Sequence, residues 1–100
     1  MIYNQPMNIQ VASRIKAIIS KHLSPQDRIF IFGSHATGTA RKWSDIDVGL
    51  SSPFPLKLNL LAHIDEELED SDIPYKVDVV DFNRVSEEFK NIALQKTIPL

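Results

Sequence analysis

The sequence predicts an α/β (α+β) fold in which a small mixed β-sheet is flanked by helices. Three observations carry this prediction. Apolar residues recur at helical spacing in two long segments, 7–23 and 56–70. Three short runs are continuously apolar or alternate between apolar and polar, as buried or half-buried strands do. The elements follow the order α-β-α-β-α-β-α, which is typical of helices covering a small sheet.

The first half of the chain is expected to hold a helix, a strand and a short helix. Segment 7–23 has an apolar stripe and should end at Ser24, because the residue before a proline avoids helical geometry. Its stripe consists of Val11, Ala12, Ile15, Ile18, Ile19 and Leu23. Arg28–Phe32 is almost wholly apolar, which predicts a strand buried on both faces. Ser34 is expected to be the N-cap of a short helix over residues 34–39.

The second half begins with a strand over Trp43–Leu50. Its alternation places Ile46, Val48 and Leu50 on one face and Asp45, Asp47 and Gly49 on the other. A helix over 56–70 and a strand over Tyr75–Asp81 should follow. Ser86, with two glutamates after it, is a good start for the last helix. The tail 97–100 is short and apolar, and no element is assigned to it.

Composition indicates one ordinary globular domain over residues 1–100, with 43% hydrophobic and 24% charged residues. No cysteine is present, so disulfides and thiolate metal sites are excluded, and a cytoplasmic location fits. No apolar run approaches the roughly 20 residues that span a bilayer. The N-terminus has no basic region followed by an apolar core, so no secretory signal is expected.

Charge is unevenly distributed along the chain. Residues 1–44 carry six basic groups and one acid, whereas residues 45–100 carry five basic groups and twelve acids. The net charge of −2 therefore hides a change of sign near residue 45. Such a layout suits a site with cations on one side and polyphosphate on the other, although an acidic helix face explains it equally well.

Carboxylates inside apolar strands are the first candidate site residues. Asp45 and Asp47 share one face, and repulsion between them would be relieved by a divalent cation such as Mg²⁺ or Mn²⁺. Asp78 lies between two valines of the third strand and joins the same face if the two strands are neighbours. Three carboxylates can hold two cations for an in-line displacement. A solvent-facing strand edge is the alternative. Asp81 lies on the opposite face and is expected to mark the strand end.

A phosphate-binding turn is the second candidate. Gly33 lets a backbone approach a phosphate closely, and Ser34 adds a hydroxyl at a helix start. Arg41 could meet phosphate oxygens or be a solvated loop residue. Ser44 could bond a carboxylate or phosphate, or serve only the turn. His35 is expected to be an exposed loop residue.

Trp43 is the one tryptophan of the chain and stands just before Ser44 and Asp45. Apolar aromatic side chains at the start of a strand generally pack against neighbouring elements. We therefore expect Trp43 to be a packing anchor, with stacking on a nucleotide base as the alternative.

These residues, in this order, resemble a known family. Gly33-Ser34, ten intervening residues, Asp45-Ile46-Asp47 and an aspartate in a later strand are similar to the nucleotidyltransferase superfamily that includes DNA polymerase beta. Within it, the size and the string GSHATGTARKWSDIDVGL resemble the minimal nucleotidyltransferases, the MNT group. The resemblance runs from about Ile9 to Ile98.

The resemblance implies the chemistry. Asp45 and Asp47 would be metal ligands, and Asp78 would be the third carboxylate, which helps to activate the attacking hydroxyl. Gly33 and Ser34 would hold the triphosphate of an NTP, usually ATP. The reaction would place AMP on an acceptor hydroxyl and release pyrophosphate with the help of Mg²⁺.

The resemblance also implies a partner. MNT proteins are typically paired with an all-helical HEPN protein in toxin–antitoxin modules, where the MNT antitoxin attaches AMP to a tyrosine of the toxin. A homo- or hetero-oligomer is therefore expected. Two alternatives stay open: an antitoxin that acts by contact alone, and a small-molecule enzyme of the aminoglycoside type. Nucleic acid is not expected as a direct substrate, since the chain is net acidic, and no membrane is involved.

Overall fold

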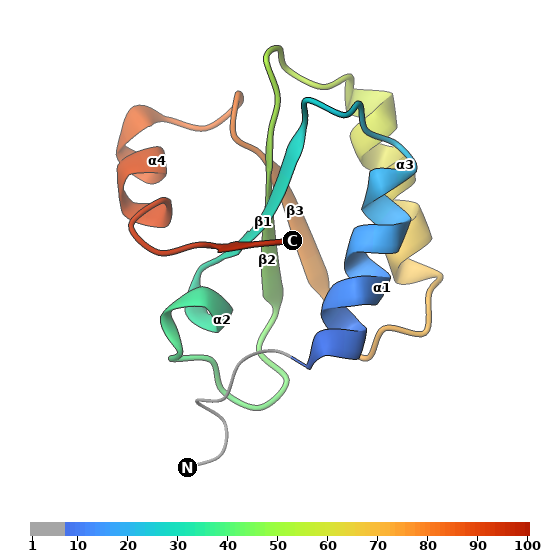
Figure 1. Cartoon of the computed structure of the whole chain (residues 1–100), viewed down its shortest axis with the longest axis vertical. Helices are drawn as coiled ribbons and strands as arrows, with labels where there is room; N and C mark the ends of the chain where they lie inside the picture. The colour runs from blue at the N-terminus through green and yellow to red at the C-terminus, as the bar shows by residue number, and fades with distance from the viewer. Residues whose placement is uncertain (1–7) are drawn as a thin grey trace.

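Four strands form one mixed sheet in the order β3-β2-β1-β4, with helices on both faces (Figure 1). The computed structural model describes residues 8–100. The elements are α1 (Ile9–Ser20), β1 (Arg28–Phe32), α2 (Ser34–Thr37), β2 (Ile46–Ser51), α3 (Leu58–Glu69), β3 (Val77–Asp81), α4 (Glu87–Ala93) and β4 (Ile98–Pro99). The predicted class, a small mixed sheet flanked by helices, is confirmed.

Strand pairing explains the order of the sheet. β1 is antiparallel to both of its neighbours, β2 on one side and β4 on the other. β2 and β3 are parallel, as expected for strands that are joined by a crossover through a helix, here α3. β3 and β4 are therefore the two edges of the sheet.

The main core lies between the sheet and the layer of α1 and α3, which Figure 1 shows side by side on one face. Alternation along β2 places every second side chain in this core, as the sequence predicts. The buried residues are Ile15, Ile18, Ile19, Ile31, Ala36, Ile46, Val48, Leu50, Ile64 and Leu68. Each fully buried aliphatic side chain here contributes about 1.5–3 kcal/mol to folding.

A smaller aromatic core fills the opposite face, beneath α4. Phe30, Phe32 and Phe82 are buried there, and their rings meet at centroid distances of 5.0–6.3 Å. Gly49 allows this packing, because a Cβ at that position would overlap the ring of Phe30 and come within 2.8 Å of Phe82. β1 therefore contributes to two cores, which confirms its predicted burial on both faces.

Several boundaries differ from the prediction. β2 begins at Ile46 rather than Trp43, so Asp45 lies just before the strand. The N-cap of α2 is Gly33, and Ser34 is the first helical residue, because the positive φ of 74° at Gly33 makes the turn. The tail forms a short strand, β4, whose Ile98 pairs with β1. The predicted helix start at residue 7 lies outside the described residues.

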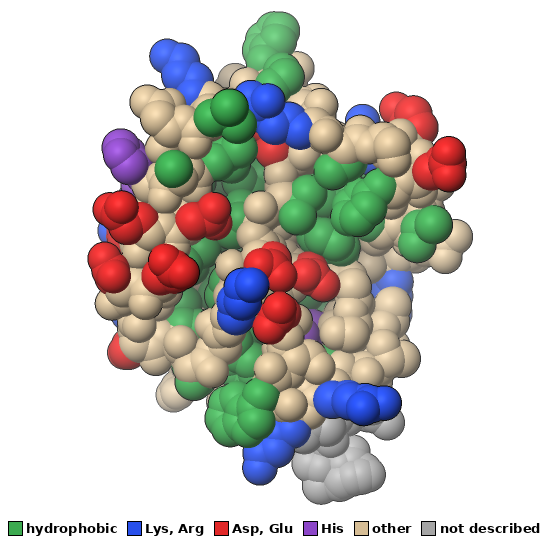
Figure 2. Space-filling view, turned by 180° about the vertical axis from the view of Figure 1, so that it is seen from behind, with side chains coloured by type: hydrophobic (Ala, Val, Ile, Leu, Met, Phe, Trp, Pro, Cys, Tyr) green, Lys and Arg blue, Asp and Glu red, His purple; other side chains and the backbone are tan. Residues whose placement is uncertain are grey.

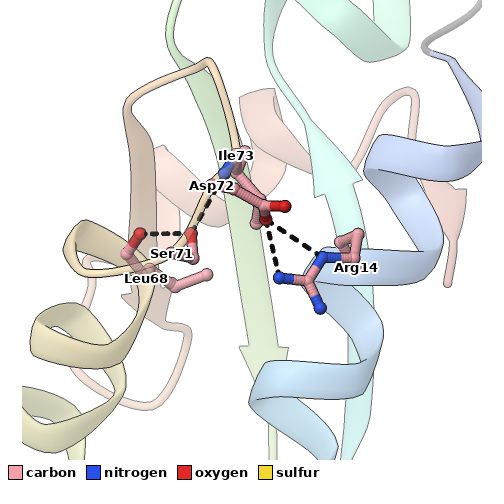
Figure 3. A network of polar contacts seen from close by, with 5 residues as sticks. All are labelled: Arg14, Leu68, Ser71, Asp72 and Ile73. Carbon is pink, nitrogen blue, oxygen red and sulfur yellow. Dashed lines mark hydrogen bonds and ion pairs between the residues drawn. The ribbon is translucent and has the colours of Figure 1, made fainter.

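Two polar networks fix the ends of β3. Before the strand, Arg14 of α1 donates to Asp72 Oδ1 at 2.6 Å, and Ser71 Oγ donates to the Leu68 carbonyl at 2.6 Å while it accepts from the Ile73 amide at 3.3 Å (Figure 3). These bonds join the loop after α3 to both helices of the main layer. They therefore hold the loop that leads from α3 to β3.

At the other end of β3, the buried Asp81 carboxylate accepts hydrogen bonds from the amides of Leu56 and Asn83 at 2.8 and 2.9 Å. Arg84 Nε lies 3.4 Å from the same carboxylate. Asp81 thus ties the loop before α3 to the strand end, in agreement with its predicted structural role. No described helix is both long and apolar enough to cross a membrane.

Candidate active site

Two of the predicted carboxylates lie side by side on neighbouring strands. The parallel register pairs Asp47 of β2 directly with Asp78 of β3. Because paired residues of adjacent strands point to the same face, both side chains project toward the side of the sheet that carries α4. Lys76 Nζ lies 3.8 Å from Asp78 Oδ1 and places one positive charge beside the pair. β3 therefore neighbours β2, which meets the condition under which the sequence places Asp78 on the same face as Asp47.

Asp45 precedes β2 and is exposed, yet it remains close enough to act electrostatically on Asp47. Burial raises the pKa of Asp47 most, and the charges of Asp78 and then Asp45 raise it further, while His35 lowers it. Three acidic groups thus share a small space, and the charges of Asp78 and Asp45 disfavour the ionised form of Asp47. A bound cation would reverse this effect.

Gly33 is in direct contact with Asp47. The antiparallel register pairs Phe32 with Asp47, so the turn that follows β1 passes over the carboxylate. A Cβ on Gly33 would overlap Asp47 Oδ2 and lie 3.3 Å from Asp47 Cγ. The backbone there has φ 74° and ψ −152°, a region that only glycine adopts readily. Ser34 follows, half-buried, at the start of α2. The turn predicted from the sequence is therefore adjacent to the carboxylates.

The loop between α2 and β2 is held by Ser44. Its hydroxyl accepts a hydrogen bond from the Arg41 amide at 2.8 Å, and its own amide donates to the Arg41 carbonyl at 3.0 Å. In this structure the Ser44 side chain serves the turn, one of its two predicted roles. The side chain of Arg41 is exposed.

His35 is buried, with only 9% of its surface exposed, so the expectation of an exposed loop histidine is wrong. Its Nε2 lies 3.0 Å from the carbonyl oxygen of Ser44, which means that Nε2 carries the proton and donates. The ring meets Tyr75 edge-to-face at 5.7 Å. A histidine on the inner side of a short helix reaches the loop that follows the helix, and its position in the chain gave no signal of this contact.

Trp43 is 58% exposed, so the expectation of a packing anchor is wrong. It has a positive φ of 67°, and its ring lies 5.4 Å from that of Tyr75 at an angle of 45°. Lys42 Nζ lies 5.9 Å from the indole centroid. The alternative expectation, that Trp43 offers a surface for a nucleotide base, remains a prediction.

A groove of about 840 Å³ opens between the carboxylates and α3. Figure 2 shows acidic side chains at the centre of this face and over α3, with a hollow between the two groups. Asp47 and Asp78 line one side, and Asp65 and Glu69 line the other. Burial raises the pKa of Asp65 most, followed by the charges of Asp78 and Glu69. The sequence indicated only a solvated face at Asp65, since its distance from Asp78 depends on the tertiary fold.

The carboxylate oxygens of the site are chemically suited to a hard divalent cation. Carboxylate oxygens are the ligands that such cations prefer. The pKa of Asp47 is raised first by burial and then by the charges of Asp78 and Asp45, and a cation would offset these charges. Within residues 8–100, no three histidine, cysteine, aspartate or glutamate side chains are already arranged as a metal cluster. The backbone therefore aligns the carboxylates, and their side chains would still have to converge on a cation.

The chain is similar in sequence to known proteins. The family model described as "Polymerase beta, Nucleotidyltransferase" matches residues 13–100. A protein of Haemophilus influenzae named probable protein adenylyltransferase MntA is 35% identical over 78 residues, which are 78% of this chain and 68% of that protein. Enzymes of this family generally use divalent metal ions, which agrees with the oxygen ligands of the site.

Solved structures share the fold. A chain in the crystal structure of a toxin–antitoxin pair with AMP-PNP has a TM-score of 0.71 at 20% identity, over 93% of this chain and 72% of that one. A chain in the complex of tri-AMPylated Shewanella oneidensis HEPN toxin with MNT antitoxin has a TM-score of 0.71 at 19% identity, over 93% and 71%. Together with the family match over residues 13–100 and the 35% identity to the Haemophilus protein, the paired aspartates and the glycine turn show that the chain belongs to the polymerase beta nucleotidyltransferase family.

Proposed function

We propose that this protein is an adenylyltransferase that moves AMP from ATP to a hydroxyl of a partner protein. The observation that carries the proposal is the pairing of Asp47 with Asp78 directly beneath the turn at Gly33. In this arrangement a polyphosphate held by the glycine turn would lie next to the aligned carboxylates. The name of the 35% identical Haemophilus relative supports the same activity.

The bonding changes of this reaction balance. The acceptor oxygen forms a bond to the α-phosphorus of ATP, and the bond from that phosphorus to the bridging oxygen of the β-phosphate breaks. Pyrophosphate leaves, and the proton of the hydroxyl passes to a carboxylate or to water. Two Mg²⁺ ions, with Mn²⁺ as a substitute, would supply charge neutralisation for the attacking and leaving oxygens.

Each predicted residue has a role in this proposal. Asp45 and Asp47 would hold the cations, and Asp78 would complete the set and accept the proton of the hydroxyl. Gly33 and Ser34 would receive the triphosphate, since the glycine turn leaves room for a phosphate to approach the backbone. The roles assigned to the remaining two residues are supporting ones: Arg41 would pair with phosphate oxygens, and Ser44 would hold the loop.

The partner in this proposal is a HEPN-type toxin, and this protein is its antitoxin in the cytoplasm. One chain of similar fold occurs in a toxin–antitoxin pair with AMP-PNP, and another occurs in the complex of a tri-AMPylated HEPN toxin with MNT antitoxin. AMP on the toxin, rather than contact alone, would then neutralise it. The oligomer expected from the sequence would be the complex of the two proteins.

The test is label transfer from α-³²P-ATP to a co-expressed HEPN-type protein in the presence of Mg²⁺. We expect labelled partner with the wild-type chain and at least about a hundredfold less with Asp47→Asn, which keeps the shape of the side chain and removes its charge. Lys57→Gln is a matched control, because its exposed side chain precedes α3 and is remote from the predicted site residues in the fold.

Label that survives Asp47→Asn would refute the catalytic assignment. If the wild-type chain and Asp47→Asn both protect cells from the toxin, but neither of them transfers label, neutralisation by contact is the correct alternative. Transfer to an aminoglycoside, and not to protein, would instead identify a small-molecule enzyme.

A further inference from the structure

β3 leaves the outward backbone groups of Val77 and Val79 without a partner strand among the described residues, whereas the Asp81 carbonyl at its end accepts from the Arg84 amide. β3 is the last strand on its side of the sheet. The Ile46 amide donates to the Lys76 carbonyl at 2.9 Å, and the Phe82 amide donates to the Leu50 carbonyl at 2.9 Å. In a parallel ladder, alternate residues of a strand face the same neighbour.

The direction of each backbone group in β3 follows from these two bonds. Asp78 and Val80 turn their amides and carbonyls toward β2, whereas Val77 and Val79 turn theirs outward. No other described element pairs with this outer side, since the sheet ends at β3. The unpaired groups are therefore available to another extended chain.

The groove follows this free edge. Consecutive residues from Tyr75 to Val80 line it, and they include side chains from both faces of the strand. Only a cavity that runs along the edge of a strand can contact both faces in succession, because side chains alternate between them. Leu68 of α3 forms part of the far wall. The groove thus has room for backbone beside β3.

The groove has an acidic lining. Asp47, Asp65, Glu69 and Asp78 border it, against one cation, Lys76. Charge complementarity therefore favours an occupant that carries lysine or arginine. The same groove reaches the proposed catalytic carboxylates without a gap, so a chain lying in it passes directly beside Asp78.

We propose that an extended, basic segment of the acceptor protein adds as a fifth strand to the free edge of β3. This inference rests on the proposed function and names how its acceptor is held. Neighbouring strands lie about 4.8 Å apart, so the residue opposite Asp78 would project on the same face as that carboxylate. Backbone hydrogen bonds to Val77 and Val79 would hold the segment, and its register would decide which hydroxyl is modified.

The experiment uses the full chain and four synthetic peptides, each acetylated and amidated, one of which has glutamates in place of lysines. The first is Lys-Thr-Val-Tyr-Val-Thr-Lys. The second and third carry N-methyl groups on alternate residues, so that one blocks the amides that face β3 and the other blocks only the amides that face away. Amide hydrogen exchange is followed by NMR with and without each peptide.

We expect the amides of Val77 and Val79 to exchange rapidly in the free chain and at least about tenfold more slowly with the unmodified peptide. The amides of Asp78 and Val80, which face β2, should be slow throughout and serve as internal controls. The peptide whose N-methyl groups block only the amides that face away from β3 should protect as well as the unmodified peptide. The peptide whose N-methyl groups block the amides that face β3 should not protect. A peptide with glutamates in place of lysines should bind more weakly.

Equal protection by both N-methylated peptides, or no protection at millimolar peptide, would overturn the proposal. Protection of Val77 and Val79 that rises with protein concentration alone would also overturn it, since a second copy would then be the occupant. Exchange does not depend on turnover, so docking is tested apart from catalysis. Label transfer to the partner without edge protection refutes only the docking, whereas protection without label transfer supports the docking and refutes the proposed function.

Discussion

Gly33→Ala should damage the site more than the same substitution at Gly38 or Gly49, because only at Gly33 would the new Cβ meet a site carboxylate. The new Cβ would overlap Asp47 Oδ2, well inside the 3.0 Å below which such contacts essentially never occur. The carboxylate would therefore have to move by roughly half an ångström or more. Misplacement of a reacting group by about 1 Å costs about a hundredfold in rate, so we expect a fall in kcat of that order.

The same substitution also strains the backbone. Residue 33 has φ 74° and ψ −152°, and side chains in such a region cost about 1–3 kcal/mol. For a domain of this size, each kcal/mol lowers Tm by about 4–8 °C. Stability is measured by circular dichroism, and activity by label transfer at a temperature where the variant is fully folded.

Gly38→Ala is the matched control. Gly38 also has a positive φ, 82°, but a Cβ added there would have nothing within 4 Å of it. This variant should lose stability through backbone strain of about 1–2 kcal/mol and keep most of its activity. If the two variants had equal activity when fully folded, the contact between Gly33 and Asp47 would not matter to catalysis, and the reasoning would be refuted.

Three further substitutions test the frame around the site. Asp81→Asn should lower the free energy of unfolding by about 1–3 kcal/mol in urea titrations, because a buried carboxylate that accepts two backbone amides loses charge-assisted bonds; an unchanged midpoint would contradict its structural role. Gly49→Ala should cost about 1–3 kcal/mol in the same assay, because its Cβ would meet the rings of the aromatic core. The pKa of Glu67 is lowered, first by a hydrogen bond from Lys21 and then by one from His22. Its contribution is therefore present above pH 4.5 and lost as pH falls through the lowered pKa, so Glu67→Gln should reduce the loss of Tm below pH 4.5; an identical Tm profile would show that the pairing adds nothing.

The pattern of apolar and polar residues along each element made much of the fold predictable. Alternation along β2 assigned Ile46 and Val48 to the core and Asp47 to the other face, and the structure agrees because a strand has a fixed period. The long helices were found from their apolar stripes. By contrast, β4 has only two residues and pairs with β1 through tertiary contact, so the short tail carried no periodic signal.

Part of the site was also predictable from local sequence patterns. The spacing of Asp45 and Asp47, and an acid inside β3, are sequence features. The strand order that brings Asp78 beside Asp47 was left open and comes only from the fold. The expectations for His35 and Trp43 were wrong because burial in a loop region depends on what packs there. His35 is buried because it lies on the inner side of α2, while the loop turns Trp43 outward through a positive φ.

The parallel pairing of β2 with β3 also has a consequence for how the protein matures. Asp47 and Asp78 come together only after the whole of α3 has crossed over the sheet, and a slip of one residue in the register would send Asp78 to the opposite face. A nascent or half-folded chain with β1 and β2 in place thus has the glycine turn but not the carboxylate pair. If Asp47 and Asp78 carry the proposed chemistry, the protein cannot act before β3 has paired with β2 in register, so activity would report that this long-range pairing has formed.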